Sequence, residues 1–129
     1  MRTSTTVTAT LFIVKIAIAF PLLLLAQTAS AEEVKLSADQ IRAYLSGKIV
    51  VNRPEGKTSF RQSFEQNGQT RYQETGRKEE VGYWNVQGDR YCSQWGPFGW
   101  SCYVMTAEGN LLTWIAEDGT RYPGQLEKP

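Results

Sequence analysis

The sequence predicts a mainly β fold, an antiparallel up-and-down meander of roughly seven to eight strands with one short N-terminal helix. Turn signals built on Gly, Asn, Asp and Pro recur about every 8 to 12 residues from residue 55 onward. The runs between these turns are short and rich in Val, Thr, Phe, Tyr and Trp, which favour strands. Strands that follow one another in this way form a curled sheet or a small barrel, and we expect the helix against one side or end of it.

Residues 1–31 read as a cleaved signal peptide rather than as part of this fold. Arg2 supplies early positive charge, an apolar stretch follows, and Ala29-Ser30-Ala31 provides the small residues that signal peptidase requires. Lys15 interrupts the apolar run, which disfavours the alternative of an uncleaved anchor of about 20 apolar residues. We therefore predict a periplasmic or secreted protein, one domain over residues 32–129, and no stable membrane insertion after cleavage.

Composition excludes several classes of function. The chain contains no His, so histidine-based catalytic triads and histidine metal ligands are ruled out. Two of the 14 basic residues, Arg2 and Lys15, lie in the signal, which leaves 12 basic against 13 acidic side chains in residues 32–129. These charges are interspersed and form no basic stripe, so we expect no nucleic-acid partner. We also expect no metal and no cofactor, since no loop has a calcium-ligand pattern.

The predicted helix lies directly before the first long strand. Ser37 is suited to the N-cap position, and Gln40 three residues later completes a capping box. Leu36 and Ile41 occupy the positions of a hydrophobic staple around that cap. Gly47 is placed to end the helix after about ten residues, and so short a helix needs packing to persist.

Three hairpins predict one apolar face of the sheet. A turn at Gly88-Asp89 sets Trp84 opposite Ser93, a turn near Pro97 sets Tyr91 opposite Tyr103, and a turn at Gly109-Asn110 sets Met105 opposite Trp114. The expected strands lie near 48–53, 58–66, 70–75, 80–87, 90–95, 100–107, 111–117 and 120–125. With these registers, one face carries Trp84, Val86, Tyr91, Tyr103, Met105, Leu112 and Trp114.

The hairpin at Asn67-Gly68 allows two registers. A two-residue turn pairs Phe64 with Arg71, whereas a bulged turn of three residues pairs Phe64 with Tyr72. We favour the bulged turn and the pairing of Phe64 with Tyr72.

A family resemblance lies in the second half of the chain. Residues 82–95 read GYWNVQGDRYCSQW, and Cys102-Tyr103 follow. This segment resembles the pattern Gly-x-Trp-x-Val-x-Gly-Asp-x-(Leu/Tyr)-Cys-x-x-Trp, then Cys-Tyr, of a family of small exported proteobacterial proteins of unknown function. The resemblance implies a periplasmic or secreted β-rich protein, and it implies no activity.

Cys92 and Cys102 are predicted to form a disulfide. They are the only two cysteines, an exported chain meets oxidising conditions, and they occupy facing positions on a hairpin. The bond would close an 11-residue loop and contribute roughly 3 kcal/mol by loop entropy.

The tip of this disulfide hairpin is the candidate partner-binding surface. Trp95, Phe98 and Trp100 lie close together there, on a loop whose freedom is restricted by glycine and proline. The alternative is that these rings fold back and cap the open end of the sheet. Trp95 shares the parity of the core face, so capping is as well supported as binding for that residue, whereas Phe98 is expected to be exposed.

Two charged groupings have structural explanations that we prefer to functional ones. The adjacent carboxylates Glu79-Glu80 and Glu117-Asp118 lie at strand ends or turns, where solvation is more plausible than a two-carboxylate glycosidase. Basic residues with acidic neighbours suggest a solvated strand face rather than an anion site. They are Arg71, Arg77, Lys78, Arg90 and Arg121.

These observations predict a non-catalytic exported binding or interaction module of the bacterial envelope, with a protein or envelope component as its partner. The alternatives are a small secreted effector that acts on host cells and an inhibitor of a foreign enzyme. Both would use the same folded surface, and we do not predict an enzyme.

The first testable prediction concerns the cleavage site. We expect the exported protein to begin at Glu32, because Ala29-Ser30-Ala31 fits the peptidase. Intact-mass measurement of the exported protein checks this. A mass that includes residues 1–31 would contradict it.

Overall fold

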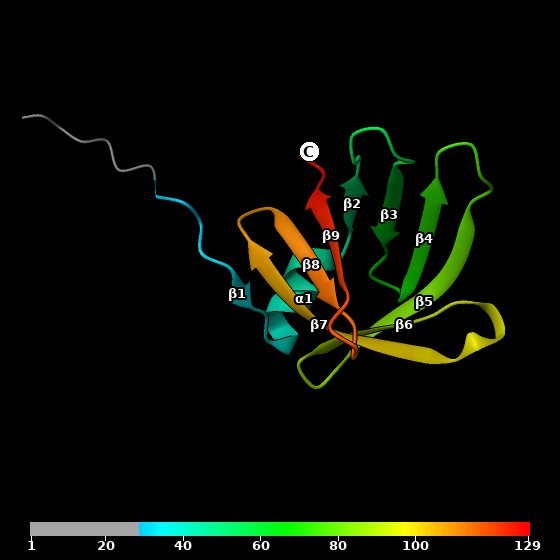
Figure 1. Ribbon diagram of the computed structural model, residues 1–129. Helices are drawn as coiled ribbons and strands as arrows, with labels where there is room; N and C mark the ends of the chain where they lie inside the picture. Colours follow the sequence, from blue (N-terminus) through cyan, green and yellow to red (C-terminus); the bar gives the residue numbers. More distant parts are fainter. Residues whose placement is uncertain (1–28) are drawn as a thin grey trace, which may run out of the picture.

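The computed structural model describes residues 29–129, so the predicted signal peptide lies outside the described residues except for its last three. The elements in Figure 1 are β1 (Val34–Lys35), α1 (Ala38–Leu45), β2 (Lys48–Asn52), β3 (Phe60–Phe64), β4 (Gln69–Glu74), β5 (Glu80–Gln87), β6 (Arg90–Gln94), the 3-10 helix η1 (Gly96–Phe98), β7 (Trp100–Glu108), β8 (Leu111–Ile115) and β9 (Arg121–Leu126). No helix within residues 29–129 is long and apolar enough to span a membrane.

Strands β2 to β9 form a closed antiparallel barrel in which each strand pairs with the next one along the chain. The pairing of β2 with β9, which lie side by side in Figure 1, closes the barrel. In this pairing Val50 lies opposite Leu126, and Val51 lies opposite Gln125. The predicted mainly β, up-and-down fold is therefore confirmed, in its barrel form.

Strand β1 is an additional strand that the sequence pattern does not predict. It lies beside the second half of β7, with Val34 opposite Ala107 and Lys35 opposite Thr106. Strand β7 extends past the end of β6, and β1 continues the sheet along that edge. A strand of two residues has no period that could distinguish it from an extended linker.

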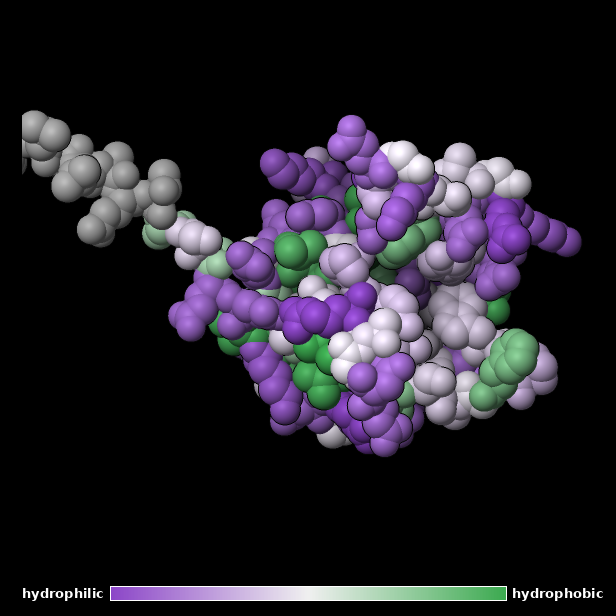
Figure 2. Space-filling view, in the orientation of Figure 1, coloured by the Kyte–Doolittle hydropathy of each residue, from purple (hydrophilic) through white to green (hydrophobic). Residues whose placement is uncertain are grey.

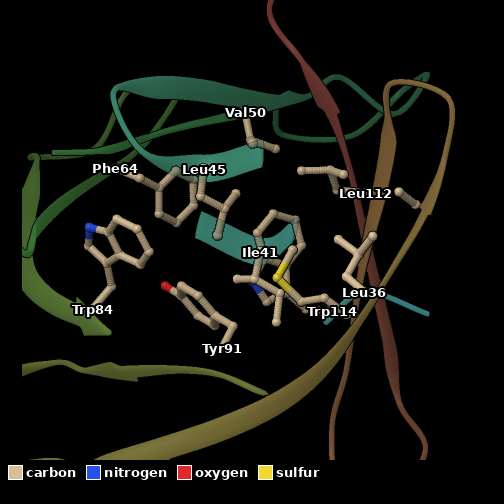
Figure 3. Close-up of a cluster of buried hydrophobic side chains, with 11 residues drawn as sticks. Leu36, Ile41, Leu45, Val50, Phe64, Trp84, Tyr91, Leu112 and Trp114 are labelled. Carbon is tan, nitrogen blue, oxygen red and sulfur yellow. The ribbon is translucent and has the colours of Figure 1, made fainter. Parts of the chain in front are cut away.

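Helix α1 closes one end of the barrel. The predicted capping box is present, since Gln40 N–H donates to Ser37 Oγ at 3.4 Å and Ser37 N–H donates to Gln40 Oε1 at 2.9 Å. Asp89 Oδ1 in the β5–β6 turn accepts the N–H of Ala38 at 2.9 Å, which fixes the helix start to the barrel. Ile41 and Leu45 are fully buried among ring side chains from the strands (Figure 3).

The barrel interior is the predicted apolar face. The three predicted registers are confirmed, with Trp84 opposite Ser93, Tyr91 opposite Tyr103 and Met105 opposite Trp114. The rings of Trp84 and Tyr91 lie edge-on to Phe64 at 5.8 and 5.9 Å. The buried cluster comprises Leu36, Ile41, Leu45, Val50, Phe64, Trp84, Tyr91, Met105, Ala107, Leu112 and Trp114.

The predicted pairing of Phe64 with Tyr72 is wrong, because Phe64 lies opposite Thr70. The turn is a three-residue loop over residues 66–68, in which Gly68 adopts a φ of 90°. Such a loop with a left-handed glycine in its last position is a common hairpin connection. A loop centred on residue 67 sets position 64 against position 70, so the predicted loop length was right and its register was wrong.

The predicted disulfide is present between Cys92 and Cys102. The two residues lie directly opposite each other on β6 and β7, with their Cα atoms 4.0 Å apart. Their side chains lie on the outer face of the barrel, because the neighbouring Tyr91 and Tyr103 point inward. The bond thus ties together the two strands that lead into the β6–β7 loop.

A glycine permits the closure of the barrel. Gly124 lies in β9, and a Cβ atom there would lie 2.4 Å from Val50 Cγ1 on β2. Real Cβ atoms do not approach other heavy atoms so closely. The absence of a side chain at this position therefore lets β9 approach β2 closely enough to pair with it.

The second prediction tests the seam, by which we mean the pairing of β2 with β9. Gly124→Ala should lower the free energy of unfolding by about 1–3 kcal/mol, since the added methyl group overpacks against Val50. Urea unfolding followed by tryptophan fluorescence measures the change. Gln125→Ala, at an exposed neighbouring position, is the control and should be nearly neutral. In the double variant Gly124→Ala/Val50→Ala, part of the Gly124→Ala cost should disappear. Full stability of Gly124→Ala would refute the role of Gly124.

Candidate functional site

The barrel end opposite α1 is open and contains a cavity of about 320 Å³. Seven aromatic side chains line it, and they come from β3, β4, β6, β7, β8, β9 and the residue after β6. They are Phe60, Tyr72, Tyr91, Trp95, Tyr103, Trp114 and Tyr122. Figure 2 shows pale side chains of intermediate hydropathy around a hollow between the β4–β5 and β6–β7 regions.

The inward period of the strands places these rings. On β3, every second side chain points inward. Phe64 lies in the core, Gln62 lies nearer the open end, and Phe60 lies at the mouth. Tyr72 lies opposite Gln62, and Tyr122 lies opposite Trp114. The same alternation that builds the core therefore continues past it and lines the cavity.

The rings face the cavity from different directions. Tyr72 and Trp95 are 6.2 Å apart with their planes at 72°, and Tyr103 and Tyr122 are 6.2 Å apart with their planes at 86°. Phe60 lies 5.3 Å from Tyr72 with a smaller interplanar angle of 34°. Because neighbouring rings in the walls lie at large angles to each other, a molecule in the cavity would contact both ring faces and ring edges.

Gly82 makes room for the ring of Trp95. A Cβ atom at position 82 would lie 2.6 Å from both the Trp95 ring and the carbonyl oxygen of Gln94. Gly82 is an inward position of β5, opposite Thr70. The missing side chain lets the indole lie over the strand and form one wall of the cavity.

The cavity floor carries an ordered set of polar groups. Gln62 Nε2 donates to Thr70 Oγ1 at 2.9 Å and to the Tyr91 hydroxyl at 3.4 Å. Thr70 Oγ1 donates in turn to the carbonyl oxygen of Ser63 at 2.9 Å, so it must accept from Gln62, which fixes the amide orientation. The Tyr91 hydroxyl accepts from Gln62, which leaves its own proton to donate. Ser93 adds a second hydroxyl to the lining.

Three of the lining tyrosines hold their protons more strongly than usual. Burial raises the pKa of Tyr91 well above the ordinary value of 10.0. Burial, reinforced by the hydrogen bond to Glu74, raises the pKa of Tyr72 to about 12. Burial also raises the pKa of Tyr103, with a smaller contribution from Tyr122. These phenols are therefore neutral at any physiological pH.

Glu80 is the one charged side chain among the described residues that line the cavity. It lies opposite Tyr72 in the β4–β5 register, on the exposed rim. Its sequence neighbour Glu79 instead binds Arg71 at 3.0 Å. Glu117 and Asp118 lie in the β8–β9 turn, where Asp118 Oδ1 accepts the N–H of Thr120. The two adjacent carboxylate pairs of the sequence therefore do not face each other across this cavity.

Three of the basic residues noted in the sequence are held by carboxylates. Arg71 binds Glu65 and Glu79 at 2.9 and 3.0 Å, and the pKa of Arg71 is raised by these partners, chiefly by its hydrogen bond to Glu65. Lys78 and Arg90 are exposed. The other two ion pairs join Arg77 to Glu74 and Arg121 to Glu33. These contacts agree with the interpretation of a solvated, paired face.

The structure separates the three predicted partner-binding residues. Trp95 points into the cavity, as its core parity allows. Phe98 lies in η1 and is 87% exposed, so the expected exposure of Phe98 is confirmed. Trp100 begins β7 and shares the outer face with Cys102, with 45% of its surface exposed. Trp95 therefore lines the cavity, whereas Phe98 and Trp100 are exposed and lie outside its lining.

Sequence reasoning missed several residues of the cavity. Phe60, Gln62, Tyr72 and Tyr122 received no site role, although each continues the inward parity of its strand. The signal that could have identified them is this parity, followed from the core residues of each strand to positions 60, 72, 103 and 122. That parity alone does not reveal the cavity, because closure of the barrel, which brings β3 and β9 to the same mouth, is not visible in single hairpins.

Neither a metal site nor a known relative adds to this description. Within residues 29–129, no three Asp, Glu, His or Cys side chains form a group that could hold a metal ion. Comparisons of the chain with protein-family models, curated proteins and solved structures find no match.

The third prediction concerns the tyrosines. Of the six tyrosines, Tyr72, Tyr91 and Tyr103 should titrate late in a pH-jump spectrophotometric titration of the folded protein. Because the folded pKa lies above the unfolded value of 10.0, the stability linked to these groups is complete below pH 10.0 and is lost as pH rises towards about 12. Tyr72→Phe should remove one late phenol and flatten the loss of unfolding free energy in that window. Simultaneous ionisation of all six phenols near pH 10 would contradict this.

Proposed function

We propose that this chain is a non-catalytic, exported binding protein that takes a small organic molecule into the mouth of its barrel. One observation carries the proposal, namely that seven aromatic side chains surround an open cavity of about 320 Å³. Small-molecule sites are concave, largely apolar and lined by a few well-placed polar groups, and this volume is within their range. The mouth of a small barrel is a common place for such sites.

The chemistry of the lining favours binding over catalysis. Hydrolysis by paired carboxylates needs a second carboxylate within about 5 to 10 Å of the first. Among the described lining residues, Glu80 alone carries a carboxylate. The chain also contains no His that could serve as a general base for the hydroxyl of Ser93.

Export and location belong to the proposal as well. The Ala29-Ser30-Ala31 motif and the Cys92–Cys102 disulfide are typical of a chain that matures in an oxidising compartment. A periplasmic or secreted binding module of the bacterial envelope fits both features, and its interspersed charges fit the expectation of no nucleic-acid partner.

A second candidate function is protein binding through the β6–β7 tip, in an effector or an inhibitor of a foreign enzyme. Phe98 supports it, because its aromatic ring is 87% exposed on a loop closed by a disulfide, and aromatic side chains are frequent anchors at protein interfaces. The disulfide between Cys92 and Cys102 would limit the ordering entropy lost on contact. In this case the tip, and not the cavity, would carry the function.

The fourth prediction distinguishes the two candidates. N-phenyl-1-naphthylamine, an uncharged aromatic probe, should bind the purified oxidised protein and show enhanced fluorescence. Ser93→Leu should fill part of the cavity and Trp95→Ala should remove one wall, so each should weaken binding about tenfold. Thermal melting verifies that each variant is folded.

Phe98→Ala is the matched control, because it removes an aromatic ring from the same hairpin but outside the cavity. It should leave probe binding unchanged. The proposal fails if the probe does not bind, or if Phe98→Ala abolishes binding while the two cavity variants retain it.

A further inference from the structure

We propose that the cavity binds an organic cation, specifically a quaternary ammonium group on a small molecule. This inference rests on the proposed function, and it specifies the charge and the head group of the ligand. Three features of the mouth support it: the arrangement of the rings, the sign of the charge at the rim and the largely apolar surface of the wall at Phe60, Tyr72 and Trp95.

The rings provide several negative faces around one volume. The face of an aromatic ring attracts a cation within about 6 Å of the ring centre. The ring centre of Tyr72 lies 5.3 Å from that of Phe60 and 6.2 Å from that of Trp95. The ring planes of Tyr72 and Trp95 are inclined by 72° to each other. Adjacent rings inclined in this way allow a single compact cation to contact more than one ring at the same time.

The charge at the rim has the matching sign. Glu80 lies directly opposite Tyr72 on the neighbouring strand, so its carboxylate is beside this aromatic corner. No Lys or Arg is among the described residues that line the cavity. The nearby Arg77 binds Glu74, and Arg71 binds Glu65 and Glu79. An anionic ligand would therefore meet Glu80 without a compensating cation in the lining.

The walls favour a methylated ammonium over a primary one. A primary ammonium has three N–H donors, and each needs an acceptor when it is removed from water. The walls at Phe60, Tyr72 and Trp95 consist mainly of ring carbon. A quaternary ammonium has no N–H group that needs an acceptor, so it can lie against these rings without losing a hydrogen bond. Tyr91 and Ser93 lie on the floor, where their hydroxyl groups can bind a hydroxyl at the other end of the ligand.

The fifth prediction compares two nearly isosteric probes by isothermal titration calorimetry. Choline carries the ammonium nitrogen and a hydroxyl, and 3,3-dimethylbutan-1-ol replaces that nitrogen with carbon. We expect choline to bind about tenfold more tightly than the alcohol, because only the cation interacts with the ring faces and with Glu80. Added salt should weaken choline binding and leave the alcohol unaffected.

Glu80→Gln should reduce the preference for choline severalfold while it keeps the size of the side chain. Glu79→Gln is the matched control, since Glu79 is the adjacent carboxylate but lies outside the lining, and it should keep the preference. Tyr72→Leu, which keeps an apolar side chain but removes the ring, should also reduce it. Thermal melts confirm that all three variants are folded.

The possible failures are distinguishable. If the uncharged alcohol binds as well as choline, or if choline fails to bind where N-phenyl-1-naphthylamine binds, the cation preference is refuted and the cavity remains a site for neutral molecules. If none of the three probes binds, the proposed function fails together with this inference. Unchanged preference in both Glu80→Gln and Tyr72→Leu would also overturn it.

Discussion

The pairing of β9 with β2 is the contact on which the rest of the molecule depends. It turns a meander into a barrel and leaves neither strand as a free edge. This contact also gives the barrel an enclosed interior with two ends. Helix α1 fills one end with Ile41 and Leu45, held in place by the capping box and by Asp89. None of the helices within residues 29–129 fills the other end, and the inward side chains there enclose a cavity instead of a core.

Core and cavity share residues in this barrel. Tyr91 and Trp114 pack against the buried cluster around Phe64 and at the same time line the cavity. Their substitution would therefore change stability and binding together. Phe60, Tyr72, Trp95 and Tyr122 lie further out, so they are better positions for changing the cavity without disturbing the core. Glu80 and Tyr122 are the lining residues least coupled to the core, because both are exposed.

The sequence was sufficient for the local structure and insufficient for the site. Hairpins obey short-range rules, so the registers of β5 to β8 and the disulfide followed from turn positions and from the period of two. The Phe64 register was wrong by two residues although the predicted loop length was right, because a three-residue loop centred on residue 67 pairs Phe64 with Thr70 and not with Tyr72. Strand β1 has too few residues to show a period. The cavity depends on β3 meeting β9, and such long-range closure leaves no signal in any single window of the chain.

The seam also dictates an order of assembly. Val50 and Leu126 lie at opposite ends of the folded domain's sequence, so the barrel cannot close until nearly the whole chain is available. The disulfide hairpin, by contrast, joins residues separated by only 10 positions and can form as soon as both cysteines are present. Contacts between distant residues carry the larger loop-closure cost and form more slowly than local ones. While the seam is open, β2 and β9 expose unpaired edges, and this interval is when the chain is most exposed to association with other molecules.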